Sequence, residues 1–544
     1  MRKKVLSTTM AAVATLACFA TAGCGAKKTP DTDQTLEIFV VDAGYGVQWA
    51  HDIAELFKQE DWVKEKYPEL VVEVKSNDQK TFVQTQLSTP KVNTYDLMFG
   101  CYLYDQAGSE DIIDLTESVY NQKVPGEDIL FKDKMETACL EELAYFNPNN
   151  PDADESYWYV PWQGGIQGIV YNADLLKEFG FDHEPYTTDE LYEMCVAIKK
   201  AHRKVDGLET EIYPFIQSSD ADYWSMYMFQ TWWAQYQGID GYNNFYRGID
   251  DGSRSSDIFK QKGRLESLKV FEKLLKSNGN AEDTTANFVN PQSFNVKFMV
   301  AQSSLLQGHA VFHVNGDWFD NEMKEMKADI IANGGKDYTM SFCIPVISAI
   351  KDQCATIADD AELRALIKAV DENSSSLTGE GYDVSREDYD KVVEARFLAN
   401  GGSGSTLGVI PSYAKGKAPA IDFLRYMATD KALGAYVNAT YGTKLLFKYD
   451  VQEKNPELYA NLTPAHKRIE KMYNNTLTNF TTLRYNKSFP LCGYGNVKPF
   501  VDEKYYEKFS AVGNTKTPQN FFDETIQYWD NTAWQSALAR AGLN

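Results

Sequence analysis

The chain lacks the sequence motifs of the common metal and nucleotide sites. It contains no H-E-x-x-H, no G-x-x-x-x-G-K-[ST] and no C-x-x-C, which are the patterns of zinc proteases, phosphate-binding loops and many zinc or redox centres. Its six histidines are scattered. His309 and His313 fall in an expected strand, where a spacing of four does not bring side chains together. We therefore expect no metal, no cofactor and no catalytic residues.

Positive charge and long apolar runs are also scarce. Lys and Arg number 54 against 77 Asp and Glu, so the formal net charge is −23. This acidity opposes binding to nucleic acid and to anionic lipid. After the first 23 residues no apolar run reaches the ~18 residues that a membrane-spanning helix requires, so we expect the body of the protein not to cross a membrane.

The first residues have the pattern of an export signal. Met1–Lys4 is basic, Val5–Ala20 is apolar, and Thr21-Ala-Gly-Cys24 places small residues before a cysteine. This ending resembles a bacterial lipoprotein box, which implies removal of residues 1–23 and lipidation of Cys24. Residues 24–34 are short and polar and indicate a tether. The alternative is an ordinary secreted protein that is cut nearby.

Cysteine is too sparse to form a disulfide scaffold. Of eight cysteines, six belong to the body of the chain, whereas disulfide-dependent folds are small and cysteine-dense. We expect most of the six to be buried thiols.

The length and the first segments predict α/β architecture in two lobes. About 520 residues exceed what one hydrophobic core usually supports. Leu36–Val41 and Leu70–Val74 have the composition of strands, and Trp49–Gln59 between them carries a helical apolar stripe. A right-handed crossover then makes the two strands parallel, and the loop Asp42–Gln48 lies at the ligand edge of the sheet. Tyr95–Phe99 is a third strand, followed by the loop Gly100–Asp105.

The stretch Tyr157–Asn172 predicts a passage between two lobes. Its front half is aromatic, its middle contains Gly164, Gly165 and Gly168, and its end is a β-branched strand. A short helix follows, with Gly180 placed to end it. Ligand in a crevice between lobes would lie beside such a segment.

Several later segments have recognisable patterns. Thr187-Thr-Asp-Glu190 is a capping box that begins a helix. In the aromatic stretch that begins at Phe215, we expect Phe229 and Trp233 to be core residues. Residues 236–256 indicate a loop or hairpin. The acidic loop 147–155 could bind Ca²⁺, but it lacks EF-hand spacing, which favours a solvated turn. Ala399–Ile410 is glycine-rich, yet neither a phosphate loop nor a G-x-S-x-G elbow.

Three segments together resemble one family. They are Val160-Pro-Trp162 with Gly168–Asn172, the strand ending in Gly316-Asp-Trp318, and the glycine-rich 399–410 with the helix 418–429 after it. They resemble extracellular solute-binding proteins of ATP-driven importers, of the carbohydrate-binding type that includes maltose-binding protein. The resemblance implies a two-lobe, type II periplasmic-binding-protein-like fold with three crossings, near 162–166, 309–314 and 403–409. The implied lobes are discontinuous: 35–162 plus 312–404, and 165–309 plus 408–544.

The resemblance also implies function. The protein would be a monomeric, lipid-anchored receptor outside the cytoplasm that binds an oligosaccharide and delivers it to the membrane permease of an ABC transporter. Rings would stack on the sugar and polar side chains would bind its hydroxyls. Asp317 could equally be the N-cap of the next helix. The candidate ligand contacts are Asp42, Tyr45, Tyr102, Asp105, Trp162, Gln163, Asp222, Tyr223, Trp224, Asn315, Asp317, Trp318 and Ser403.

Two other functions fit the same residues. One is a solute-binding protein for a peptide or another polar solute. The other is a surface glycoside hydrolase, which would need two carboxylates held ~5–10 Å apart across the scissile bond.

Overall fold

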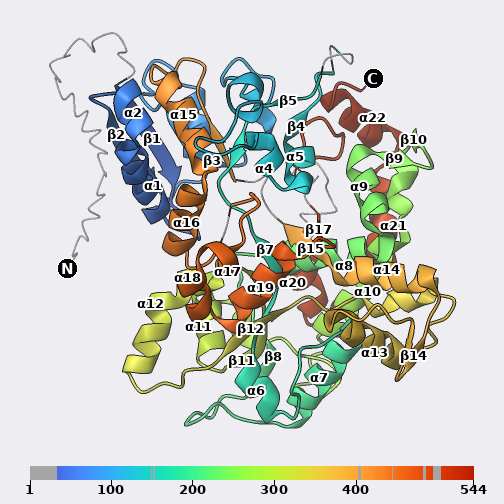
Figure 1. The fold of residues 1–544 in the computed structure, drawn as a ribbon. Helices are drawn as coiled ribbons and strands as arrows, with labels where there is room; N and C mark the ends of the chain where they lie inside the picture. The colour runs from blue at the N-terminus through green and yellow to red at the C-terminus, as the bar shows by residue number, and fades with distance from the viewer. Residues whose placement is uncertain are drawn as a thin grey trace, which may run out of the picture.

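Two β-sheets, each covered by helices, form the upper and lower halves of the molecule (Figure 1). The computed structural model describes residues 34–148, 150, 154–401, 406–443, 445–481, 485–493 and 504–543. Cys24, Ser403 and the expected signal peptide and tether up to residue 33 lie outside the described residues.

The first sheet has the strand order β2-β1-β3-β16-β6. β1 is parallel to β2 and β3, as the crossover pattern predicts, whereas β16 is antiparallel to β3 and β6. The loop after β1 therefore lies at the carboxyl edge of the parallel strands, as expected. Its strands are β1 (Thr35–Val41), β2 (Val71–Asn77), β3 (Leu97–Cys101), β6 (Val160–Pro161) and β16 (Thr406–Val409).

The helices around this sheet come from both ends of the chain. α1 buries Trp49, Ile53 and Phe57 on one face, which confirms the predicted stripe, and it packs against α16. The first half contains α1 (Gln48–Gln59), α2 (Asp61–Lys66), α3 (Phe82–Leu87), η1 (Tyr104–Gln106), η2 (Thr116–Tyr120), α4 (Phe131–Lys134), α5 (Thr137–Leu143), the hairpin β4 (Ala144–Tyr145) and β5 (Ser156–Tyr157), α15 (Lys417–Met427) and α16 (Asp430–Ala439).

The second sheet has the order β17-β15-β7-β11-β8, and β12 also pairs with β7. β7 is its central strand and is buried along its whole length. This burial explains the run of β-branched residues after Gly168. The strands are β7 (Ile166–Asn172), β8 (Tyr213–Phe215), β11 (Ala310–Gly316), β12 (Met340–Cys343), β15 (Leu398–Gly401) and β17 (Asn479–Phe480).

Most of the remaining helices surround the second sheet. They include one that the sequence did not predict, α9, within the expected loop or hairpin 236–256. The elements are α6 (Ala173–Glu178), α7 (Thr188–Lys200), η3 (Trp224–Met228), α8 (Phe229–Gln237), α9 (Ile239–Arg247), the hairpin β9 (Ile249–Asp250) and β10 (Ser253–Arg254), η4 (Ser256–Lys260), α10 (Lys262–Leu275), η5 (Pro291–Phe294), α11 (Phe298–Leu306), α12 (Phe319–Ala332), η6 (Ser348–Gln353), α13 (Asp360–Asp371), the hairpin β13 (Thr378–Gly379) and β14 (Tyr382–Asp383), and α14 (Arg386–Arg396).

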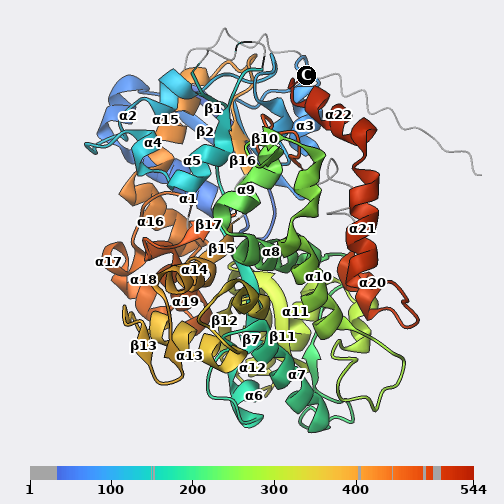
Figure 2. The ribbon, with the colours of Figure 1, turned by 90° about the vertical axis from the view of Figure 1, so that its right-hand side faces the viewer.

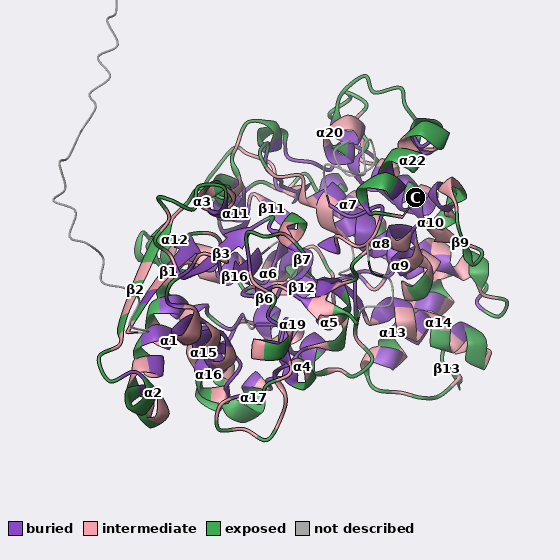
Figure 3. Cartoon of the chain, turned by 90° about the horizontal axis from the view of Figure 1, so that it is seen from above, coloured by how far each residue is buried: buried purple, intermediate pink, exposed green. Residues whose placement is uncertain are grey.

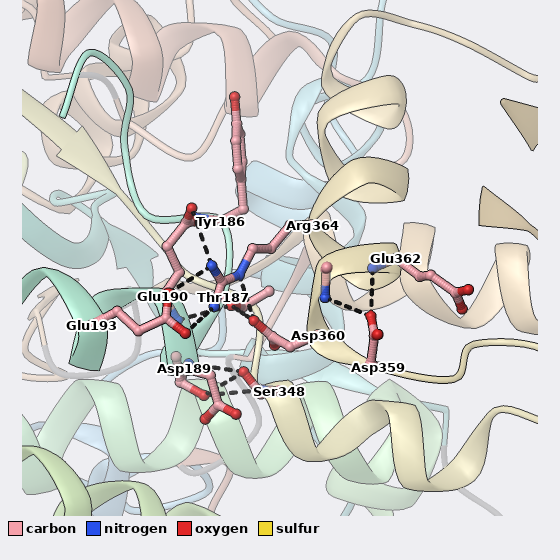
Figure 4. A network of polar contacts seen from close by, with 12 residues as sticks. Tyr186, Thr187, Asp189, Glu190, Glu193, Ser348, Asp359, Asp360, Glu362 and Arg364 are labelled. Carbon is pink, nitrogen blue, oxygen red and sulfur yellow. Dashed lines mark hydrogen bonds and ion pairs between the residues drawn. The ribbon is translucent and has the colours of Figure 1, made fainter. Parts of the chain in front are cut away.

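The helix α7 begins with a modified capping box (Figure 4). The Thr187 hydroxyl accepts the Glu190 backbone N–H at 3.2 Å, as predicted. The Glu190 carboxylate, however, accepts the N–H of Tyr186 at 2.6 Å rather than that of Thr187. Arg364 of α13 then binds both carboxylate oxygens of Glu193 at 2.8 and 2.9 Å, so α7 and α13 are joined.

The chain passes between the sheets at three places, but not all where the sequence predicted. The first passage links β6 to β7, near 162–166 as expected. The second links β15 to β16, close to the expected 403–409. Both run side by side, since Gly401 pairs with Ile166 and Leu407 with Pro161.

The expected crossing near 309–314 is wrong. β11 pairs antiparallel with β7 from Phe312 to Gly316 and parallel with β8, so it stays in the second sheet. β12 and β15 also pair with β7, which places most of 312–404 with the second sheet and not the first. The third passage instead follows Lys448, whose N–H still bonds Lys134 in the first half.

The carboxyl-terminal part returns to the second sheet and then extends back towards the first. α19 packs on β12, and α20 and α21 pack on α10. Figure 2 shows α20, α21 and α22 along one side, with the C-terminus beside the upper half. The segments are α17 (Val451–Lys454), α18 (Pro456–Asn461), α19 (Pro464–Asn474), α20 (Tyr505–Ser510), α21 (Pro518–Tyr528) and α22 (Asn531–Arg540).

Burial follows this two-part architecture. Seen from above, buried residues fill the interiors and exposed residues gather on peripheral loops (Figure 3). Five of the six described cysteines are buried and Cys354 is half-buried, which confirms the expectation of mostly buried thiols. Within the described residues, no helix combines the length and apolar composition needed to cross a membrane.

Candidate functional site

Four aromatic rings from both halves meet where the chain passes between the sheets. Trp318, between β11 and α12, contacts Tyr223 and Tyr227, each with a ring-centroid distance of 5.9 Å. On its other side it meets Tyr45 edge-on at 6.4 Å. Tyr45 belongs to the loop after β1 in the first half. Tyr223, Tyr227 and Trp318 are half-buried, so their rings can stack on a ligand, whereas Tyr45 is buried. We call Tyr45, Tyr223, Tyr227 and Trp318 the aromatic cluster.

Tyr45 is bonded to the second half through its hydroxyl. It donates to Oδ1 of Asp317 at 2.6 Å and lies 3.2 Å from the carbonyl of Gly164. A Cβ on Gly165 would be 2.9 Å from the Tyr45 hydroxyl and 3.0 Å from Asp317. The glycine predicted to loosen this passage is therefore needed for the close approach of Tyr45 and Asp317.

Asp317 is a buried acid rather than a helix cap. The first turn of α12 begins after Trp318 without a side-chain cap, which excludes the N-cap alternative. The Asp317 side chain is 1% exposed, and its Oδ2 has no hydrogen-bond partner among the described residues. Burial raises its pKa to about 7, so the carboxyl group changes charge near neutral pH.

A second acid, Glu322, lies beside the cluster and was not predicted. Its Oε2 accepts the Gln302 amide at 2.8 Å, and burial raises its pKa to about 7. Its Oε1 would be 3.1 Å from a Cβ on Gly44, so Gly44 permits α12 to approach the loop after β1. The sequence signal was available, because Glu322 follows Trp318 by four residues and thus shares its helix face.

Tyr102 directly follows β3 and is close enough to Tyr223 for its charge to act on the Tyr223 hydroxyl. It is 38% exposed and has a φ of 57°, a backbone conformation that is uncommon for a bulky residue. The pKa of Tyr223 is raised well above its ordinary value, chiefly by burial. The charge of Glu322 raises it further, and Asp220 and Tyr102 add smaller contributions. Tyr102 of the first half and Tyr223 of the second are therefore neighbours in the same polar and aromatic environment.

The structure moves two predicted ligand contacts into the core. Trp162 is fully buried, stacks on Trp49 at 5.7 Å and donates its indole N–H to the Gly100 carbonyl. Trp224 is also fully buried and packs edge-on against Phe215 at 5.0 Å. Neither ring has a surface left for a ligand. Their aromatic character stabilises the two halves instead, as expected for Phe229, which is buried too.

The other candidates are placed away from the rings or have local roles. Asp42 is exposed, and its N–H bonds the Asn77 carbonyl at 2.7 Å. Asp222 accepts the N–H and hydroxyl of Ser225 at 3.0 and 2.7 Å. Asn315 is fully buried and bonds the Gly316 N–H. Gln163 is half-buried beside Gly164 in the first passage.

The remaining candidate, Asp105, is exposed, and its backbone carbonyl is contacted by a segment from the distant tail. Residues 485–493, which we call the strap, contact the first half through Lys487 and Asn486. The Lys487 ammonium donates to the carbonyls of Asp105 and Ala107, both at 2.8 Å. The Asn486 amide donates to the carbonyl of Ala144 at 2.8 Å. The strap also reaches α9 of the second half, where the Leu491 N–H bonds Tyr246, so it joins both halves.

No group of three or more His, Cys, Asp or Glu residues within the described ranges could hold a metal ion. Asp154 and Glu155 of the acidic loop belong to this part of the chain, and Glu155 accepts the Tyr157 hydroxyl at 2.8 Å. Asp152 lies outside the described residues.

Comparisons with known proteins agree with the two-part architecture. The sequence profile of the family described as bacterial extracellular solute-binding protein matches residues 50–433. A comparison with curated proteins finds no significant match. At the level of structure the chain is similar to many solved proteins.

Three of these structures illustrate the similarity. One, from work on xylan utilization by Caldanaerobius polysaccharolyticus, is 13% identical with a TM-score of 0.57, over 91% of this chain and 100% of that chain. The sugar-binding protein MalE from Xanthomonas citri is 13% identical, with a TM-score of 0.55, over 93% of this chain and 98% of that chain. A chitin oligosaccharide binding protein is 13% identical, with a TM-score of 0.55, over 92% of this chain and 98% of that chain. At such identities the similarity establishes the fold, which is the expected type II periplasmic-binding-protein-like fold.

Proposed function

Because the chain belongs to the bacterial extracellular solute-binding protein family, we propose that it is the receptor of an ABC importer that captures an oligosaccharide between its two halves. In this proposal the two halves are the lobes of the receptor. From the strand pairing, the first lobe would consist of residues 35–161 and 406–448, and the second lobe of residues 166–401 and 451–543. Closure around the sugar would present it to the membrane permease.

The observation that carries the proposal is the aromatic cluster. Sugars offer apolar ring faces and many hydroxyls, and proteins bind them with aromatic faces beside polar groups. Trp318, Tyr223 and Tyr227 of the cluster and the nearby Tyr102 offer rings, and Glu322, held by the buried Gln302, offers a carboxylate beside them. Because these groups belong to both lobes, a sugar that contacts them would favour closure by its differential affinity for the closed state.

The comparisons favour a sugar over another solute. Proteins of the same fold are described as a chitin oligosaccharide binding protein, the sugar-binding MalE of Xanthomonas citri and a maltose-bound MalE3 of Thermotoga maritima. A peptide or another polar solute is the second candidate, since the family description names no ligand. A hydrolase is disfavoured by Asp317, whose carboxylate is buried against Tyr45 and unsuited to contact a scissile bond.

We propose further that Cys24 carries the lipid anchor that holds the receptor at the outer face of the cell membrane. A polar tether up to residue 34 would separate the lipid from β1. Monomeric action suits this arrangement, since one lobe pair forms the whole cleft.

Isothermal calorimetry with a panel of oligosaccharides tests the proposal, with release of reducing ends assayed in parallel. We expect binding in the micromolar range, about −8 kcal/mol, without cleavage. Cleavage would show a hydrolase. Heat with peptides but with no sugar would establish the second candidate.

A further inference from the structure

A cavity opens between the two halves, and it is lined by other residues than the aromatic cluster. Its volume is about 670 Å³, and none of the residues of the aromatic cluster lines it. The first half contributes Glu136–Glu141 at α5 and Lys448–Asp450. The second half contributes α9 and the segment Tyr473–Phe480. A volume of this size is typical of small-molecule sites.

The cavity wall is acidic. Glu136, Glu141, Asp240 and Asp450 line it, against the single basic residue Lys448. Glu141 is paired with Arg247, and the Lys448 ammonium is bound to the Asp133 carbonyl at 2.9 Å. For Glu136 and Asp240 the described residues provide no ion-pair partner, so negative charge in the cavity is left unbalanced.

A buried side chain in the wall also lacks a donor. Asn243 of α9 is 8% exposed, and its Oδ1 has no hydrogen-bond partner among the described residues. An unsatisfied buried acceptor destabilises the protein unless a ligand or water donates to it. The hydroxyl of Thr478, another lining residue, is likewise buried without a described partner. The unsatisfied Oδ1 of Asn243 therefore favours a ligand that carries N–H or O–H donors.

We propose that this cavity is a binding site for a small organic cation with primary ammonium groups, such as a diamine or polyamine. An ammonium group has three donors and no acceptor, which complements carboxylates and the Asn243 oxygen. A chain of two or more ammonium groups can reach Glu136 on the first half and Asp240 on the second. The site is separate from the sugar cleft, so binding needs no sugar.

Calorimetry with putrescine and spermidine at physiological ionic strength tests the site directly. We expect both amines to bind, and Glu136→Gln/Asp240→Asn to weaken binding by about tenfold or more, since hydrogen bonds to charged groups are strong. Asn243→Leu, which removes the acceptor and keeps the size, should weaken it as well. Thermal unfolding of each variant verifies that it folds.

The control for general attraction to an acidic protein is Glu380→Gln/Glu387→Gln. Both residues are exposed and lie outside the cavity, so this variant should bind amines as the unmodified protein does. Equal weakening in both double variants would overturn the proposal, as would an absence of heat with amines.

A second control separates this site from the sugar cleft. Amine binding should survive Tyr223→Ala/Trp318→Ala, whereas sugar binding should not. Loss of amine binding in that variant would mean that the amine occupies the aromatic cluster, and the cavity proposal would be wrong. Amine binding without any sugar binding would support the cavity and contradict only the proposed function.

Discussion

Tyr45 and Asp317, 272 residues apart in sequence, are joined by a 2.6 Å hydrogen bond between the two halves of the molecule. One comes from the loop after the first strand and the other from the end of β11. The bond lies beside the first passage of the chain, where Gly165 leaves room for it. Any relative movement of the halves must keep or break this contact.

The first prediction concerns pH. The Asp317 pKa of about 7 is well above its ordinary value of 3.8, because burial disfavours the charged form. The unfolded chain therefore loses this proton near pH 4 and the folded protein keeps it to about pH 7. Stability should decrease across this interval, by a few kcal/mol at most, and level off above it.

The measurement is urea unfolding of the unmodified protein and of Asp317→Asn from pH 4 to pH 8. The asparagine keeps an acceptor for Tyr45 and cannot ionise. The stability of this variant should therefore decrease less between pH 4 and pH 7 than that of the unmodified protein. Asp329→Asn, at an exposed position on α12, the helix that follows Asp317, should keep the full decrease in stability. Parallel pH curves for Asp317→Asn and the unmodified protein would contradict the prediction.

A second prediction tests the aromatic cluster. Tyr223→Ala and Trp318→Ala should each weaken oligosaccharide binding by about tenfold, since ring stacking contributes roughly 0.5–1.5 kcal/mol beyond its buried area. Tyr528→Ala, at a ring that is 52% exposed on α21, should leave affinity unchanged. Calorimetry measures all three. Full affinity in Trp318→Ala would remove the cluster from the site.

The third prediction compares a glycine of β7 with a glycine of α16. A Cβ on Gly168 would lie 2.9 Å from the carbonyl oxygen of Cys343, so Gly168→Ala must displace β12 and should cost about 1–3 kcal/mol. Gly434→Ala in α16, where the Cβ meets only the Tyr449 hydroxyl at 3.1 Å, should have a much smaller effect. Chemical denaturation of both variants decides whether the β7–β12 contact is as tight as described.

A fourth prediction concerns the strap. Lys487→Ala removes two charge-assisted hydrogen bonds to carbonyls of the first half and should loosen residues 485–493. Hydrogen exchange should become faster in this segment and in the loop at Asp105. Lys516→Ala, which removes an exposed ion pair with Glu524, is the matched control, because such pairs contribute little. Unchanged exchange in Lys487→Ala would show that the strap is held by packing alone.

The fifth prediction concerns the leader. If Cys24 carries the proposed lipid anchor, Cys24→Ala should release the protein from the membrane fraction, because the acyl chains would attach through that thiol. Cys18→Ala, inside the segment that is removed, should stay membrane-bound. Fractionation with immunoblotting distinguishes lipidation from cleavage of an ordinary secreted protein, in which both variants would be released.

Local pattern was sufficient to predict the elements around the site. The stripe of α1, the parallel β1 and β2, the start of α7 at Thr187 and the first passage near 162–166 all follow from short-range periodicity, capping and glycine placement. The same local information could not separate a ligand-facing ring from a core ring. Trp162 and Trp224 lie beside glycine-rich or polar residues in sequence, yet both are enclosed by rings from other elements.

The sequence by itself determined the α/β class, the two-lobe family resemblance and the aromatic and acidic character of the chain, because these depend on composition and on neighbours within a few residues. Only the tertiary structure decided which strand stays in which sheet, since β11 is kept by its pairing with β7. It also decided which groups meet. Tyr45 with Asp317, Gln302 with Glu322 and Lys487 with the loop after β3 are contacts between distant segments, and only the packing of the folded chain brings such segments together.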